Sequence, residues 1–293
     1  MIKNQGAVML CGHGSRDKNA VLQFQSMVNS IKKTYLSNYD VESGFLEFCH
    51  PTIEQGFQNL KNLGHKKIFA LPIMMFAANH IKNDLPSEIN NFINKNKNIQ
   101  IQFGRPLTID PYLLKACKER IEESLIHHKN INKKNILLMV VGRGTSDPDA
   151  NANIYKLSRL LHEGLGFGKT EVSYSGTAKP YIDEGLRESM KLSYPYVVVF
   201  PYFLFSGVLI NRIYEKTDLI SKEFPNIKII KAQYLNNHPM VIKSLFNRLL
   251  EINQKNNNMN CQLCKYREQI IGYEQDMGKP QYGHHHHVRA SDI

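Results

Sequence analysis

An internal repeat is the feature that most constrains this chain, because about the first 125 residues return some 129 positions later. The similarity is weak in residue identity but consistent in order and spacing. Three blocks recur, namely Val8–Asp17 as Leu138–Asp147, Pro51–Gly56 as Pro180–Gly185, and Leu71–Phe76 as Phe200–Phe205. The sequence therefore predicts two similar lobes.

Each repeat shows the pattern of alternating strands and helices. Short apolar runs rich in branched residues are typical of buried parallel strands: Ala7–Cys11, Lys67–Pro72, Ile99–Phe103, Asn135–Val141 and Tyr196–Pro201. Apolar residues at three- and four-residue spacing are typical of amphipathic helices: Asn19–Tyr35, Thr52–Leu63, Pro111–His128, Asn151–Leu165, Ile182–Leu192 and His238–Asn253. The predicted order is β-α-β-α-β-α twice. We expect an α/β protein in which each lobe has a parallel sheet flanked by helices.

Changes in the pattern along the chain predict its division into domains. We expect an N-terminal lobe over residues 1–130 that carries the active site, and a degenerate repeat lobe over residues 131–253. The polar run Gln254–Asn258 then separates the second lobe from a short irregular tail, residues 254–293.

Composition excludes several classes of protein. No apolar run approaches the about 20 residues of a membrane helix, and the N-terminus has no secretory apolar region, so we expect a cytoplasmic protein that contacts no membrane. Five cysteines in 293 residues form no disulfide framework. The net charge is +11, but the basic residues are scattered and no nucleic-acid-binding motif is present. A small polycarboxylate or phosphorylated substrate would be attracted equally well by this charge.

The two repeats can be compared with each other to separate packing residues from functional ones. The Gly-x-Gly turn after the first strand and the prolines and phenylalanines at strand ends recur in both repeats, which indicates a role in the fold. Three polar positions do not recur: His13 is matched by Arg143, Glu47 by Gly176, and His80 by Leu209. A site that exists once needs its residues in only one repeat.

His13, Glu47 and His80 each follow the carboxyl end of a predicted strand, where βα folds place their binding sites. Each residue alone is compatible with an ordinary loop position. Together, two imidazoles and a carboxylate form a site suited to a divalent first-row metal such as Co, Fe or Ni, with positions left open. The same groups can also accept protons from an N–H acid.

The first repeat resembles the sirohydrochlorin chelatases of the class II, metal-only group. The resemblance is carried by the Gly-His-Gly-Ser-Arg turn at Gly12–Arg16, by Glu47 followed by Pro51-Thr-Ile, and by Leu71-Pro72 leading to His80 and Asp84-Leu-Pro86. The second repeat is similar to the degenerate repeat of that family. The resemblance implies that His13, Glu47 and His80 bind the incoming metal ion and take up pyrrole protons without ATP.

The resemblance also implies the substrate and its partners. Sirohydrochlorin is a tetrapyrrole with many carboxylates, and a basic protein attracts it. Lys82, Arg143 and Arg212, near the predicted strand ends, are candidate partners of those carboxylates, although each can equally be an ordinary surface charge.

The tail has a metal-binding composition. It contains Cys261 and Cys264 in a Met-x-Cys-x-x-Cys segment and a run of histidines at His284, His285, His286 and His287. We read this run as native, because a purification tag is normally longer and terminal. The tail is similar to that of long cobalt-type members of the family, some of which hold an iron–sulfur cluster. Two cysteines cannot complete a four-thiolate cluster. Either a second chain supplies the others, in a homodimer formed through the tail, or the tail binds another metal through its histidines.

The sequence favours a cobaltochelatase that inserts Co²⁺ into sirohydrochlorin on the anaerobic route to cobalamin. Only the tail motif favours Co²⁺ over Fe²⁺, whose product is siroheme, and nothing in the sequence shows which histidine accepts the proton. A non-catalytic cobalt or nickel storage or delivery protein is the alternative from another class. A phosphatase of the Arg-His-Gly type is excluded, because Gly12 precedes His13 where that motif requires arginine.

Overall fold

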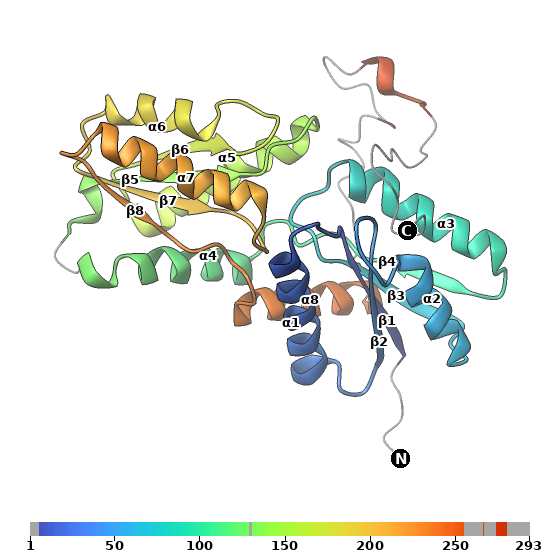
Figure 1. Ribbon diagram of the computed structural model, residues 1–293. Coiled ribbons are helices and arrows are strands. Elements are labelled where there is room, and N and C mark those ends of the chain that lie inside the picture. Colours follow the sequence, from blue (N-terminus) through green and yellow to red (C-terminus); the bar gives the residue numbers. More distant parts are fainter. Residues whose placement is uncertain (1–5, 129–130, 255–265, 267–273, 280–293) are drawn as a thin grey trace. The chain divides into compact units, whose positions relative to one another are not determined.

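The computed structural model describes residues 6–128, 131–254, 266 and 274–279. The described residues contain two four-stranded parallel sheets, with the strand orders β2-β1-β3-β4 and β6-β5-β7-β8 (Figure 1). The sequence prediction of an α/β fold with internal duplication is confirmed. The chain divides into two compact units, Met1–Thr108 with Ile242–Ile293, and Ile109–Val241.

The first unit places helices on both faces of its sheet (Figure 1). Phe57 of one helix packs on Phe92 of the next with ring centroids 5.2 Å apart, and on the opposite face Tyr35 stacks on Phe246 at 4.7 Å. The strands are β1 (Ala7–Gly12), β2 (Asp40–Phe45), β3 (Lys67–Pro72) and β4 (Gln100–Phe103). The helices are α1 (Lys18–Tyr35) and α8 (Pro239–Asn253) on one face, and α2 (Ile53–Asn62) and α3 (Leu85–Lys95) on the other.

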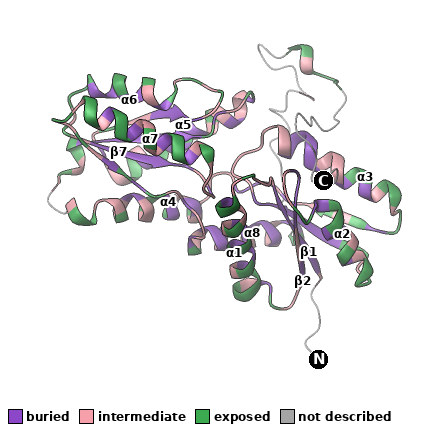
Figure 2. Cartoon of the chain, in the orientation of Figure 1, coloured by how far each residue is buried: buried purple, intermediate pink, exposed green. Residues whose placement is uncertain are grey.

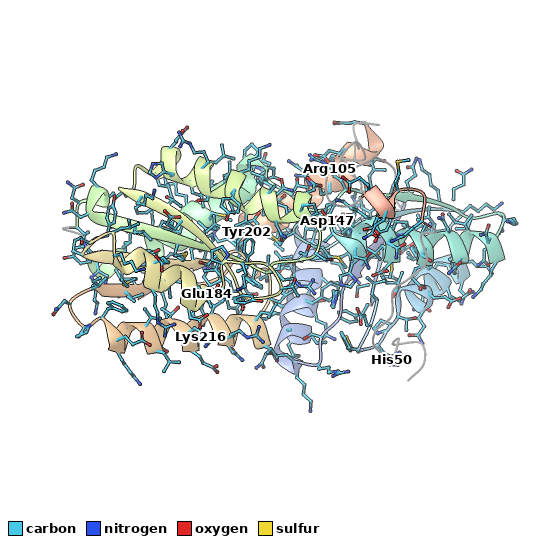
Figure 3. The ribbon with its side chains drawn as sticks, turned by 90° about the horizontal axis from the view of Figure 1, so that it is seen from above. His50, Arg105, Asp147, Glu184, Tyr202 and Lys216 are labelled. Atoms are coloured by element: carbon cyan, nitrogen blue, oxygen red, sulfur yellow. The ribbon has the colours of Figure 1, made fainter. Side chains whose placement is uncertain are left out.

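The second unit has the same arrangement. Its strands are β5 (Ile136–Gly142), β6 (Lys169–Tyr174), β7 (Tyr196–Pro201) and β8 (Lys228–Lys231). Its helices are α4 (Pro111–Ser124), α5 (Pro148–Leu165), α6 (Ile182–Met190) and α7 (Val208–Glu223). Asp147, labelled in Figure 3, is the N-cap of α5. Its side chain accepts hydrogen bonds from the backbone N–H groups of Asp149 and Ala150.

The central strands are buried, whereas the helices keep an exposed outer side (Figure 2). All six residues of β1 are buried, as expected for a strand covered on both faces. Ala7, Met9 and Cys11 belong to the core beneath α2 and α3. Burial raises the pKa of the Cys11 thiol, so this cysteine remains a neutral core residue.

The compact units differ from the sequence repeats by the exchange of one helix. Helix α4 comes from the first repeat and belongs to the second unit, where it packs with α5. Most of α8 comes from the second repeat and belongs to the first unit. Each sheet is thus completed by the last helix of the other repeat.

Each repeat contains four βα units, one more than the three that the sequence pattern predicted. In each sheet the first strand along the chain lies between the second and the third. The direction of winding therefore reverses between β1 and β3 in one sheet and between β5 and β7 in the other. Ligands of doubly wound sheets bind beside this switch point, at the carboxyl ends of the strands.

None of the described helices is both long and apolar enough to cross a membrane.

Candidate metal centre

His13 is the first residue after β1. The following residue, Gly14, has a φ of 97°, in the left-handed region that favours glycine. A Cβ atom at Gly14 would lie 1.8 Å from the carbonyl oxygen of Glu47, so only glycine lets the two loops approach this closely. The Nδ1 atom of His13 lies 2.9 Å from the carbonyl oxygen of Gly14. This contact fixes the ring and leaves Nε2 facing the centre of the site.

Glu47 follows β2, the neighbour of β1 in the sheet. Its backbone N–H donates to the carbonyl oxygen of His13 at 3.0 Å, which continues the pairing of the two strands past their ends. The Glu47 carboxylate is 7% exposed, and its Oε1 lies 3.4 Å from Nε2 of His13. A carboxylate this well buried needs a cation or hydrogen-bond donors close by.

His80 begins a single turn of π-helix, η1 (His80–Asp84), just before α3. Such wide turns are frequent at functional sites. The wide turn brings Asp84 beneath His80, so that the His80 Nδ1 atom lies 2.7 Å from Asp84 Oδ2. Asp84 is 2% exposed and also accepts a hydrogen bond from the Asn83 side chain at 3.0 Å. A buried carboxylate on Nδ1 holds the His80 ring with Nε2 directed outward.

The three loops bring one ligand atom each from His13, Glu47 and His80 to within 4.8 Å of one another. The Nε2 atoms of the two histidines are 2.9 Å apart. The imidazoles remain partly open to solvent, at 29% and 21% exposure, above the buried carboxylate. An ion can therefore reach the donors from one side.

The contacts of the two imidazoles suit a cation between them. Each ring has an acceptor at Nδ1, the Gly14 carbonyl for His13 and the Asp84 carboxylate for His80. Neutral rings that donate from Nδ1 direct two Nε2 lone pairs at each other, an arrangement that a shared proton or a metal ion stabilises. Two imidazoles and a carboxylate on one side of an ion leave the remaining positions open.

Sequence reasoning did not assign a role to Asp84, although the two repeats contain the signal. Asp84 is matched 129 positions later by Ile213, which is fully buried in α7. The second repeat lacks both the histidine and the carboxylate, and α7 runs without a π-turn. A buried charge that appears only in the repeat with the histidine indicates a role at the site.

The three cations predicted to bind carboxylates lie in different environments. Arg143 and Arg212 are exposed at the carboxyl end of the second sheet, and Arg212 donates from Nη1 to the Ser175 carbonyl oxygen at 2.6 Å. Lys82 lies in η1 and is 7% exposed, so it is the least accessible of the three.

The predicted tail ligands Cys261, Cys264 and His284–His287 lie outside the described residues. The tail residue Tyr266 is described, and its hydroxyl donates to the side-chain oxygen of Asn79 at 2.9 Å. Asn79 precedes His80 directly.

Comparison with known proteins identifies the family. The profile of the CbiX family matches residues 7–124 and 137–252, one segment in each repeat. A sirohydrochlorin cobaltochelatase of Priestia megaterium is 34% identical over 267 residues, which cover 90% of this chain and 86% of that protein. A sirohydrochlorin ferrochelatase of the same organism is 33% identical, over 79% of this chain and 85% of that protein.

A solved structure agrees with this result. The structure described as SirB from Bacillus subtilis with Fe³⁺ has a TM-score of 0.74 and 27% sequence identity to this chain, and the match covers 86% of this chain and 97% of that one. The resemblance seen in the sequence is thus confirmed for the family. On these matches, which include both repeats, the chain belongs to the CbiX family.

Proposed function

We propose that the protein is a sirohydrochlorin cobaltochelatase, which inserts Co²⁺ into sirohydrochlorin without ATP on the anaerobic route to cobalamin. The observation that carries this proposal is the convergence of His13, Glu47 and His80 within 4.8 Å, in a chain whose relatives include sirohydrochlorin chelatases. In this proposal Co²⁺ is a substrate and not a resident cofactor.

The chemistry of metal insertion matches the donors of the site. The incoming ion must lose water ligands, and the tetrapyrrole must lose its pyrrole N–H protons. His13, Glu47 and His80 replace water around Co²⁺, while an imidazole or the carboxylate accepts a proton from the ring. Asp84 acts through His80, because a carboxylate on Nδ1 fixes the ring orientation and makes the Nε2 atom a better ligand.

Siroheme formation by Fe²⁺ insertion is the closest alternative. The relative named as a ferrochelatase is almost as similar as the one named as a cobaltochelatase, at 33% against 34% identity. Two imidazoles and one carboxylate bind both ions, so the donor set does not distinguish them. A cobalt or nickel storage or delivery protein remains the alternative without catalysis.

Several further parts of the proposal rest on the sequence. The active site belongs to the first sequence repeat, residues 1–130. The degenerate repeat spans residues 131–253, and residues 254–293 form the tail. Cys261, Cys264 and His284–His287 bind an iron–sulfur cluster or another metal, and two chains associate through this tail. Lys82, Arg143 and Arg212 bind substrate carboxylates. We place the protein in the cytoplasm, without nucleic acid or membrane partners.

The proposal is tested by following the absorption spectrum of sirohydrochlorin mixed with Co²⁺ and the purified protein. A blank without protein and the variant His80→Ala are the controls, and Fe²⁺ and Ni²⁺ are run in parallel. We expect faster metallation than in the blank, a large loss of this acceleration in the variant, and the highest rate with Co²⁺. A protein that binds Co²⁺ but leaves the rate at the blank value would favour storage or delivery.

A further inference from the structure

Phe48 has a strained backbone next to the metal centre. It follows Glu47 directly and has a φ of 68°, a value that costs a residue other than glycine about 1 kcal/mol or more. Its counterpart in the second repeat is Thr177, which is not among the described residues with positive φ. The strain therefore accompanies the site and is not a requirement of the repeated fold.

The strained backbone places an aromatic ring beside His13. The ring centroids of Phe48 and His13 are 6.1 Å apart, and the Phe48 side chain is only partly buried. A phenylalanine that is partly open to solvent at the edge of a metal centre offers an apolar surface to a flat conjugated ligand.

Arg16 lies on the same ring. Its Cζ atom is 4.9 Å from the centroid of Phe48, a cation–π contact that restrains the guanidinium. Arg16 is exposed, and among the described residues no carboxylate lies within ion-pair distance of it. Its counterpart in the second repeat is Ser146. The guanidinium can therefore donate hydrogen bonds to a ligand carboxylate in the paired geometry that favours arginine over lysine.

We infer that Arg16 and Phe48 form a substrate subsite beside the metal centre. Phe48 contacts the conjugated macrocycle, and Arg16 binds a carboxylate at its periphery. Such a pair orients a flat, acidic ligand with its central nitrogens toward His13 and His80. The inference rests on the proposed function, since it assumes a carboxylate-bearing tetrapyrrole as the substrate.

The inference is tested by steady-state metallation kinetics with sirohydrochlorin and Co²⁺. We expect Arg16→Ala to raise KM for sirohydrochlorin about tenfold, which corresponds to about 1.4 kcal/mol, with kcat little changed. Arg16→Lys should recover only part of the loss, because lysine lacks the planar fork. Lys97→Ala is the matched control, because it removes one exposed positive charge near the amino end of β4, at the opposite edge of the sheet, and should leave KM unchanged.

Phe48 is tested with two variants that distinguish the role of its ring from the role of its strained backbone. Phe48→Gly keeps the positive φ without strain, and Phe48→Leu keeps an apolar side chain of similar size. Both should raise KM for sirohydrochlorin, whereas Co²⁺ binding measured without tetrapyrrole should change less than twofold in Phe48→Gly. A Co²⁺ affinity that falls as much as KM rises would mean that Phe48 only positions Glu47, and would overturn the inference.

Equilibrium binding of metal-free sirohydrochlorin, followed by its fluorescence, distinguishes a failure of the proposed function from a failure of the subsite. A wild-type protein that metallates at the rate of the blank contradicts the proposed function. Even then, weaker sirohydrochlorin binding by Arg16→Ala than by Lys97→Ala supports the subsite. Equal binding by wild type, Arg16→Ala and Phe48→Leu would overturn the subsite, whatever the metallation rate.

Discussion

At the scale of the residue, the orientation of His80 depends on Asp84. The carboxylate is almost fully buried and lies 2.7 Å from the His80 Nδ1 atom. Replacing Asp84 by asparagine keeps the shape but removes the negative charge, so the Nε2 atom becomes a weaker ligand. We expect Asp84→Asn to raise the Kd for Co²⁺ about tenfold, as measured by calorimetric titration without tetrapyrrole.

A second histidine–carboxylate pair on the same sheet provides the control. His65 Nε2 lies 2.6 Å from Asp40 Oδ2 near the amino end of β2, away from the three ligand atoms. Asp40→Asn should leave the Kd for Co²⁺ unchanged. An equal affinity in wild type and Asp84→Asn would show that the carboxylate is not required for the site.

Gly14 tests whether the site depends on the close approach of two loops. An alanine at position 14 would meet the Glu47 carbonyl oxygen at 1.8 Å, so the loop that carries Glu47 must move away from His13. We expect Gly14→Ala to lower the Tm and to weaken Co²⁺ binding by at least tenfold. Gly64 also has a positive φ, 89°, but a Cβ atom there meets nothing within 4 Å.

Gly64→Ala therefore measures the effect of a strained positive φ without the clash that an alanine at position 14 would cause. It should cost about 1 kcal/mol of stability and leave the Co²⁺ affinity unchanged. If both variants lose stability equally and both still bind Co²⁺, the contact between the two loops does not set the geometry of the site.

The sequence made part of this site predictable. His13, Glu47 and His80 stood out because the second repeat has replaced them, and parallel strands end at one edge of a sheet. The roles of Asp84 and Phe48 depend on a π-turn and a strained φ, which local residue patterns do not reveal. A full comparison of the repeats would have found Asp84, because a carboxylate opposite Ile213 is unexpected in a core.

At the scale of the element, the central strands were predictable, whereas one edge strand of the first sheet and both edge strands of the second were missed. The all-apolar β1 and β5 have the pattern of central parallel strands. The pattern missed β2 and β6, whose sequences Asp-Val-Glu-Ser-Gly-Phe and Lys-Thr-Glu-Val-Ser-Tyr mix polar and apolar residues because they lie at an edge. The pattern also missed β8 and the helices α3 and α7, so three βα units per repeat were predicted where four exist.

Helix α8 is held to the first unit by an ion-pair network. Arg105, labelled in Figure 3, donates two hydrogen bonds of 2.7 Å to the Glu251 carboxylate, and Arg248 contacts the same carboxylate. Burial alone would raise the pKa of Glu251, but the hydrogen bonds from Arg105 and the charge of Arg248 outweigh burial. The pKa therefore lies below the usual value of 4.5.

The lowered pKa of Glu251 predicts a pH-dependent contribution to stability. A carboxyl group whose folded-state pKa is depressed stabilises the fold above its unfolded-state pKa, and loses this contribution as pH falls through the folded-state value. We expect wild type to exceed Glu251→Gln by about 2 kcal/mol in urea unfolding at pH 7. The difference should shrink as pH falls below the usual value of 4.5 and vanish below the folded-state pKa.

The exposed pair Arg159–Glu163 on α5 is the control for this network, because exposed pairs contribute little. Glu163→Gln should unfold at the same urea concentration as wild type at every pH. A difference between wild type and Glu251→Gln that stays constant from pH 7 to pH 3 would contradict the role of the ionised carboxylate.

At the scale of the whole molecule, the excess positive charge and the candidate metal centre both lie outside the tail. From Glu251 onward, five basic residues balance five acidic ones, so the net charge of +11 belongs to the first 250 residues. Removal of residues 255–293 should therefore keep the attraction for an acidic substrate. We expect the truncated protein to metallate sirohydrochlorin within about threefold of the full chain, and to bind fewer metal ions per chain by elemental analysis.

This prediction fails if truncation abolishes metallation while the fold, measured by circular dichroism, is retained. The tail would then be part of the catalytic machinery. The contact of Tyr266 with Asn79, the neighbour of His80, is the first place to examine in that case.

The central claim is that His13, Glu47 and His80 hold the metal ion that the protein inserts. The most direct test is an anomalous difference map at the cobalt absorption edge, from crystals of the full chain grown with Co²⁺. The account predicts a peak within about 2.2 Å of the Nε2 atoms of His13 and His80 and a carboxylate oxygen of Glu47. A map with cobalt bound elsewhere and no peak among these three side chains would contradict it.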